Sequence, residues 1–149
     1  MSSGDELVSV QMRVLWQRAR DRINDALAAS EFSDIRAEHL SVLQYPGPHG
    51  ERPSVLAARA GMSRQAINHL VRGLEDAGYL ERGPSIVPGQ GRAVTLTPRG
   101  DEAIAFIRAI VAALEREWAA ALGDRRFEAM RSAIEDLLAA PDATARRPR

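Results

Sequence analysis

The segment MSRQAINHLVRGLEDAGYL, from Met62 to Leu80, is the most informative part of the sequence. Its apolar residues recur every three or four positions, which is the spacing of one buried helix face. Ser63 is a favourable residue to cap the start of such a helix, and Gly78 is a favourable residue to end it. The spacing therefore predicts a helix over 63–77 with one face in a core. The residues on that face are Ile67, Leu70, Val71 and Leu74.

The opposite face of this helix carries an unusual set of polar residues. Arginine can form two hydrogen bonds with the edge of a guanine, and asparagine or glutamine can do so with an adenine. A helix N-terminus also favours a phosphate group. Any one such residue alone is better explained as a solvated side chain, but together they favour contact with DNA. The residues of this face and its N-terminus are Ser63, Arg64, Gln65, Asn68, His69 and Arg72.

The neighbouring segments predict a winged helix-turn-helix. A short helix over 54–60, with Pro53 in its first turn, ends at Gly61 and precedes the helix over 63–77. Two β-like segments, 79–83 and 92–97, enclose a Gly/Pro-rich loop, which is typical of a hairpin. We therefore expect a mainly α fold with a small β-hairpin wing over 83–92. Arg92 next to that loop suits a narrow minor groove, and Arg82 suits a phosphate.

The chain outside this region is predicted to be helical and to mediate dimerisation. We expect an N-terminal dimerisation helix within 1–34, the DNA-binding region over 35–100, C-terminal dimerisation helices over 101–140 and a disordered tail over 141–149. The first helix and the last two carry apolar faces that one small domain would struggle to cover, so a second copy is the expected partner. An intramolecular bundle against the winged region is the alternative.

Composition narrows the function classes. The net charge is zero, but residues 52–99 hold seven arginines against three acidic residues, a local balance of +4. This asymmetry favours an anionic partner for the central region. The chain has no cysteine, and its three histidines are scattered. We therefore expect that the protein is not an enzyme and that it has no metal site and no cofactor. No apolar run approaches the roughly 18 residues of a membrane span, and a cytoplasmic protein with no membrane contact is the simplest interpretation.

At this point a family resemblance is apparent. The segments PSVLAARAGMSRQAINHLVRGLEDAGYLERG and GRAVTLTPRGDEAI resemble the multiple-antibiotic-resistance regulator (MarR) family, as does IRAEHLSVL over 35–43. The resemblance covers about residues 7 to 140. It departs from the family at Gln90, where members commonly have an aspartate two residues before the wing arginine. Arg92 also lies closer to Thr97 than is usual in the family.

The resemblance implies a dimeric winged-helix transcriptional regulator, by preference a repressor, that binds double-stranded DNA at an inverted repeat. It assigns Arg92 to the wing, and it assigns to the major groove Ser63, Arg64, Gln65, Asn68 and His69. Members often respond to small aromatic or anionic effectors. Residues that could line such a site here are Arg13, Trp16, Arg20 and His39. The competing hypothesis is a winged-helix module for protein–protein contact, in which the basic region binds an acidic partner without specific DNA binding.

Overall fold

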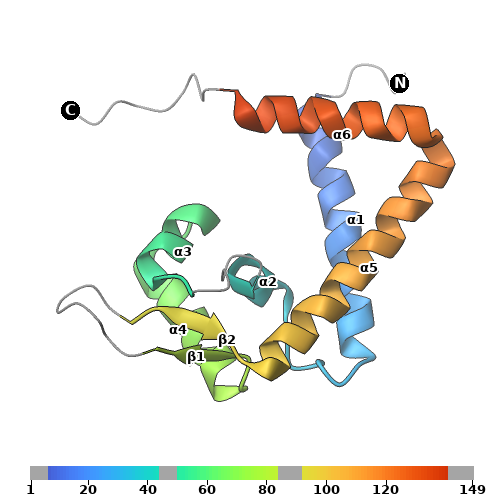
Figure 1. The fold of residues 1–149 in the computed structure, drawn as a ribbon. Helices are drawn as coiled ribbons and strands as arrows, with labels where there is room; N and C mark the ends of the chain where they lie inside the picture. Colours follow the sequence, from blue (N-terminus) through green and yellow to red (C-terminus); the bar gives the residue numbers. More distant parts are fainter. Residues whose placement is uncertain (1–6, 44–49, 84–91, 141–149) are drawn as a thin grey trace, which may run out of the picture. The chain divides into compact units, whose positions relative to one another are not determined.

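A computed structural model of the protein describes residues 7–43, 50–83 and 92–140. These residues form helices and one hairpin (Figure 1). The elements in chain order are α1 (Val8–Ala28), α2 (Ala37–Leu43), α3 (Pro53–Ala60), α4 (Arg64–Asp76), β1 (Leu80–Arg82), β2 (Val94–Leu96), α5 (Pro98–Leu122) and α6 (Asp124–Ala139). The mainly α class with a β-hairpin is therefore confirmed. The chain divides into two compact units, residues 1–111 and 112–149.

Helices α3 and α4 form the predicted helix-turn-helix. Gly61 ends α3 with a φ of +63°, a left-handed conformation that glycine adopts without steric cost. Ser63 then caps α4, because its side-chain oxygen accepts a hydrogen bond of 3.1 Å from the Ala66 backbone N–H. The two helices pack directly on each other, and α2 packs against α4. The local signals in the sequence thus set both the turn and the start of α4.

The predicted apolar face of α4 is the centre of the core. Ile67, Leu70, Val71 and Leu74 are all buried, and they join residues of α1, α2, α3 and the first turns of α5 in one cluster. Complete burial of a side chain of this size stabilises a fold by about 1.5–3 kcal/mol. Because this face is fixed in the core, the opposite face of α4 must lie on the outside of the cluster.

The hairpin follows α4 directly. β1 pairs antiparallel with β2, with Leu80 opposite Leu96 and Arg82 opposite Val94. Glu51 adds an antiparallel bridge to Val94, which extends the sheet beyond the hairpin. The wing loop over 84–91, including Gln90, lies outside the described residues, as do the 44–49 segment and the predicted tail.

Thr97 caps the start of α5 at its junction with β2. The Thr97 Oγ1 accepts a 3.1 Å hydrogen bond from the Gly100 N–H and donates a 2.6 Å hydrogen bond to the Gly78 carbonyl. Gly78, with a φ of +80°, turns the chain between α4 and β1. A single threonine therefore ties the start of α5 to the end of the recognition segment.

The apolar face of helix α1 is only partly covered within this chain. Ala19, Ile23 and Leu27 in its C-terminal half are buried. Its N-terminal half is exposed instead, with 53% of Trp16 and 71% of Leu7 accessible. The periodic pattern identifies an apolar face, but it does not say that the same chain covers it.

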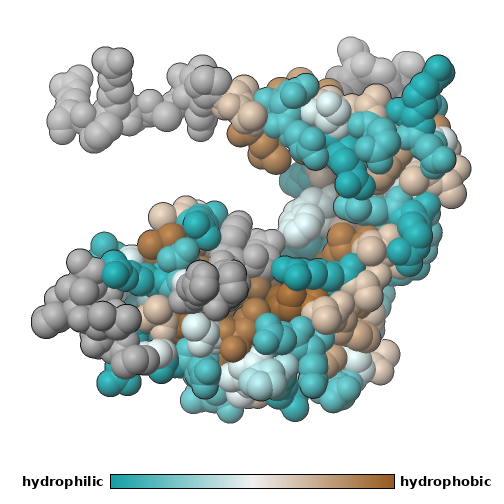
Figure 2. Space-filling model, viewed as in Figure 1, coloured by the Kyte–Doolittle hydropathy of each residue, from teal (hydrophilic) through white to brown (hydrophobic). Residues whose placement is uncertain are grey.

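The second unit contains the end of α5 and helix α6. Leu114 and Phe127 are its buried apolar residues among those described. Arg131 lies over the ring of Phe127, with its guanidinium carbon 5.4 Å from the ring centroid. Its Nη2 is 3.5 Å from Glu115 Oε2. Toward its C-terminal end α6 has apolar surface (Figure 2), where Leu137 and Leu138 are 69% and 82% exposed. Within the described ranges, no helix combines the length and apolar character needed to cross a bilayer.

Candidate nucleic-acid interface

The outer face of α4 presents the residues that the sequence predicts to contact DNA. Arg64, Gln65, His69 and Arg72 are exposed, and Asn68 is half-buried beside the core stripe. Ser63 has its hydroxyl engaged in the helix cap. Among the residues that the structure describes, the side chains of Gln65, Asn68 and Arg72 have no hydrogen-bond or ion-pair partner. This face is thus rich in donors and acceptors that are available to an external ligand.

The two predicted arginines of the hairpin lie in different environments. Arg92 is exposed just before β2. Arg82 on β1 is paired: its Nε donates to both carboxylate oxygens of Glu75 at 2.8 and 3.0 Å. Both side chains of this pair are less than one-third exposed. The guanidinium of Arg82 is therefore partly neutralised and fixes β1 to the last turn of α4, a partner that sequence spacing did not identify.

The four residues predicted to line an effector site are not all brought together. Trp16 and Arg20 on α1 line a hollow of about 230 Å³ together with four residues of α2. Those residues are Ala37, Glu38, Leu40 and Ser41. Arg13 is exposed on α1 and does not line this hollow. His39 also lies outside it.

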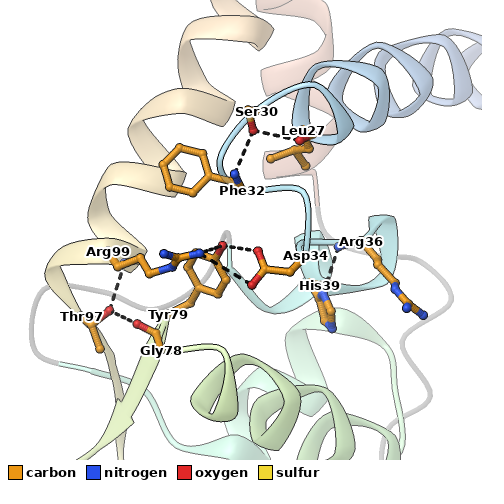
Figure 3. Close-up of polar contacts among 11 residues, drawn as sticks. Leu27, Ser30, Phe32, Asp34, Arg36, His39, Gly78, Tyr79, Thr97 and Arg99 are labelled. Carbon is orange, nitrogen blue, oxygen red and sulfur yellow. Dashed lines mark hydrogen bonds and ion pairs between the residues drawn. The ribbon is translucent and has the colours of Figure 1, made fainter.

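His39 has a structural contact that its position in the sequence could have suggested. Its Nδ1 accepts a 3.0 Å hydrogen bond from the backbone N–H of Arg36, the residue before α2 (Figure 3). A residue at the third helical position that bonds back to the cap residue is one half of a capping box. The other side of the imidazole faces α4, because a Cβ added at Gly73 would lie 3.7 Å from His39 Nε2.

This environment predicts a pH-dependent stability. Burial, more than any other influence, lowers the pKa of His39 below its ordinary value, with Arg36 and His69 acting in the same direction. The folded state then binds fewer protons than the unfolded state, so the His39 contribution is complete above about pH 6.5 and is lost as the pH falls. We expect the free energy of unfolding of the wild type to fall more steeply below that pH than that of His39→Gln, measured by urea denaturation.

Glutamine is the matched replacement at this position because its side-chain oxygen can accept the same backbone hydrogen bond without titrating. Equal pH slopes for wild type and His39→Gln would show that His39 does not contribute to the pH dependence. Because His69 is present in both proteins, a difference between their pH slopes is assigned to His39.

Comparison with solved structures identifies the class of the fold. A MarR family protein of Mycobacterium tuberculosis, solved with salicylic acid, is 25% identical, with a TM-score of 0.65 over 91% of this chain and 99% of that one. A MarR transcriptional regulator of Methanosarcina mazei is 15% identical, with a TM-score of 0.76 over 88% of this chain and 93% of that one. An S. aureus MepR mutant bound to an oligodeoxyribonucleotide is 19% identical, with a TM-score of 0.59 over 90% and 97%.

In fold, this chain is therefore a MarR-type winged-helix protein, and the resemblance found in the sequence is confirmed. No family model and no curated protein matches the sequence, so the likeness rests on the structures. The M. tuberculosis neighbour is named as a MarR family protein and the M. mazei neighbour as a MarR transcriptional regulator, which agrees with the prediction of a protein that is not an enzyme. In the part of the chain that the structure describes, no three His, Asp or Glu side chains are grouped to hold a metal ion.

Proposed function

We propose that this chain is a dimeric, sequence-specific transcriptional regulator, by preference a repressor, acting on double-stranded DNA in the cytoplasm. The observation that carries the proposal is the outer face of α4, which is exposed and polar and is fixed by a buried stripe on its other side. In a helix-turn-helix, the second helix enters the major groove with its N-terminal residues at the base edges. The MepR neighbour is solved bound to an oligodeoxyribonucleotide, which supports DNA as the ligand.

Selection of bound duplexes from a random DNA pool tests the proposal. A symmetric dimer should enrich an inverted repeat, whose half-sites lie one helical turn, roughly 34–36 Å, apart. Affinity should fall steeply with salt while the preference for the selected sequence persists. A pool without any enriched sequence would contradict the proposal and would favour the competing protein-contact module.

The second copy is expected to cover apolar helix faces that are exposed in the single chain. These faces include Leu7, Val8, Met12, Leu15 and Trp16 on α1, and Leu137 and Leu138 on α6. Apolar side chains grouped in this way on an isolated chain mark an interaction surface. Size-exclusion chromatography with light scattering should give twice the 16.3 kDa of the chain at micromolar concentration. A monomeric mass would contradict the dimer.

Arg82 could either contact a DNA phosphate or hold the hairpin against α4, and the effect of Glu75→Gln on DNA affinity distinguishes these two roles. If Arg82 contacts a phosphate, Glu75→Gln removes a competing carboxylate and DNA binding becomes tighter. We expect the opposite result, because the pair holds β1, and with it the wing, against α4. Glu75→Gln should weaken operator binding by up to about tenfold, since glutamine replaces a charged acceptor pair by one neutral acceptor and a hydrogen bond between charged groups contributes about 1.5–3 kcal/mol.

Fluorescence anisotropy with a labelled operator measures this effect. The salt dependence of binding provides the control. Loss of a phosphate contact lowers the slope of log affinity against log salt concentration by about one, whereas a change in the position of the wing can weaken binding without changing this slope. Asp76→Asn removes a neighbouring exposed carboxylate and is the matched charge variant. Tighter DNA binding by Glu75→Gln would support the prediction that Arg82 contacts a phosphate.

The hollow between α1 and α2 is the proposed effector site. Trp16 offers an aromatic face and Arg20 a cation, a combination that suits a small aromatic acid, although Glu38 on the same hollow limits the negative charge it accepts. The salicylate complex of the M. tuberculosis neighbour supports this ligand class. In a Trp118→Phe background, salicylate should change Trp16 fluorescence saturably, and Arg20→Gln should weaken that response. An unsaturable response would contradict a site here.

A further inference from the structure

We infer that Asp34, Tyr79 and Arg99 form a positioning cluster that fixes how the winged helix joins the helices on either side of it. The Tyr79 hydroxyl donates a short hydrogen bond to Asp34 Oδ1 and accepts a 3.0 Å hydrogen bond from Arg99 Nη2. The Arg99 guanidinium carbon lies 4.8 Å from the centroid of the Tyr79 ring, and Nη2 is 3.7 Å from Asp34 Oδ2. Figure 3 shows the three side chains converging on the phenol oxygen.

The three residues come from the three segments that meet at this joint. Asp34 belongs to the connection between α1 and α2, Tyr79 to the turn between α4 and β1, and Arg99 to the first turn of α5. Tyr79 is 45 residues from Asp34 and 20 residues from Arg99 in the sequence. The cluster therefore links the exit of the recognition helix to the elements that precede and follow the winged region.

Apolar packing beneath the cluster holds the joint together. The Tyr79 ring is completely buried, and its centroid lies 6.4 Å from that of Phe32, which in turn lies 5.5 Å from that of Phe106 on α5. Such packing is strong but has little directional preference. Hydrogen bonds depend steeply on angle, so the polar cluster is the part that selects one orientation of the joint.

The exposure of the charged members supports a role in orientation more than in stability. The side chains of Asp34 and Arg99 are 48% and 45% exposed, and exposed ion pairs contribute little to folding. Burial, together with the hydrogen bond to Asp34, raises the pKa of Tyr79. The phenol thus stays protonated at neutral pH and remains able to donate to Asp34.

The functional consequence rests on the proposed dimeric regulator. In such a dimer, the direction in which α1 and α5 leave each winged helix determines how far apart the two recognition helices lie. Half-site spacing is a geometric property of the dimer, whereas base preference belongs to the recognition helix. Loss of the cluster should therefore relax the selection for spacing and leave the preferred half-site sequence unchanged.

The experiment compares full-length wild type, Tyr79→Phe and Asp34→Asn on the selected operator. The duplexes carry the same half-sites with the spacer unchanged, lengthened or shortened by one base pair, and a scrambled duplex serves as reference. Tyr79→Phe keeps the ring and its packing and removes only the hydroxyl, while Asp34→Asn alters an exposed residue. Asp25→Asn, exposed on α1, is the matched control.

We expect the preference for the best spacer to fall at least about tenfold in Tyr79→Phe, which loses two hydrogen bonds to charged groups, and to fall less in Asp34→Asn, whose amide oxygen can still accept from Tyr79. The double variant should lose less than the sum of the two single variants, because both changes act on the same cluster, and Asp25→Asn should match the wild type. Unchanged spacing preference in both folded variants, or an altered half-site sequence, would overturn the positioning role alone. A wild type that prefers no duplex over the scrambled one would overturn the proposed function and this inference with it.

Discussion

Replacement of Gln65, Asn68 and His69 together by alanine should reduce the preference for the operator over unrelated duplexes by about a hundredfold, because each good base contact contributes about 1–3 kcal/mol of discrimination. Non-specific binding should survive, since it depends mainly on the phosphate charges. Alanine has a higher helix propensity than any of the three residues it replaces. The variant should therefore fold at least as well as the wild type, and a loss of preference would report recognition directly.

Competition anisotropy with specific and scrambled duplexes measures this discrimination. Arg92→Ala is the contrasting variant, because removal of an exposed cation beside the wing should weaken all duplexes alike and lower the salt slope by about one. A triple variant that retains the operator preference of the wild type would show that α4 does not read the bases. The regulator proposal would then lose the observation on which it depends.

Local signals in the sequence were sufficient to predict the central part of the fold. The bounds of α4 follow from Ser63 and from the glycine after its last turn, and its buried stripe follows from periodicity alone. Each of these features depends on residues within a few positions of one another, so the printed sequence contains all that is needed. The outer face could be predicted for the same reason, because a helix with one face buried must present the other.

The partners of individual charged residues could not be predicted in this way. The sequence predicts that Arg82 contacts a phosphate, and this stays a prediction; the structure adds an ion pair with Glu75, seven residues earlier, that the sequence did not suggest. Arg99 and Asp34 are 65 positions apart, and only the assembled joint brings them to the same phenol. Apolar periodicity likewise identified the N-terminal half of α1 as an apolar face without showing what covers it.

Gly100→Ala is expected to destabilise this chain strongly. In a helix interior, alanine is ordinarily favoured over glycine by about 1 kcal/mol. Here a Cβ at Gly100 would lie 2.2 Å from the Tyr79 carbonyl oxygen and 3.0 Å from Leu96 Cδ2. The first of these neighbours is backbone, and that same carbonyl accepts a hydrogen bond from the Thr97 N–H. Relief of the overlap must therefore move α5 away from the hairpin.

We expect the free-energy cost of this movement to exceed the gain in helix propensity. The protein should be destabilised by about 3 kcal/mol, the upper part of the range for overpacking. Urea denaturation with circular dichroism measures the difference. Gly73→Ala is the matched control, the same substitution within α4, where the added Cβ meets His39 Nε2 at an ordinary 3.7 Å. That variant should be more stable than the wild type by about 0.5–1 kcal/mol. Gly100→Ala with wild-type stability would show that α5 does not approach the Tyr79 carbonyl this closely, and the joint on which the positioning cluster acts would need a different geometry.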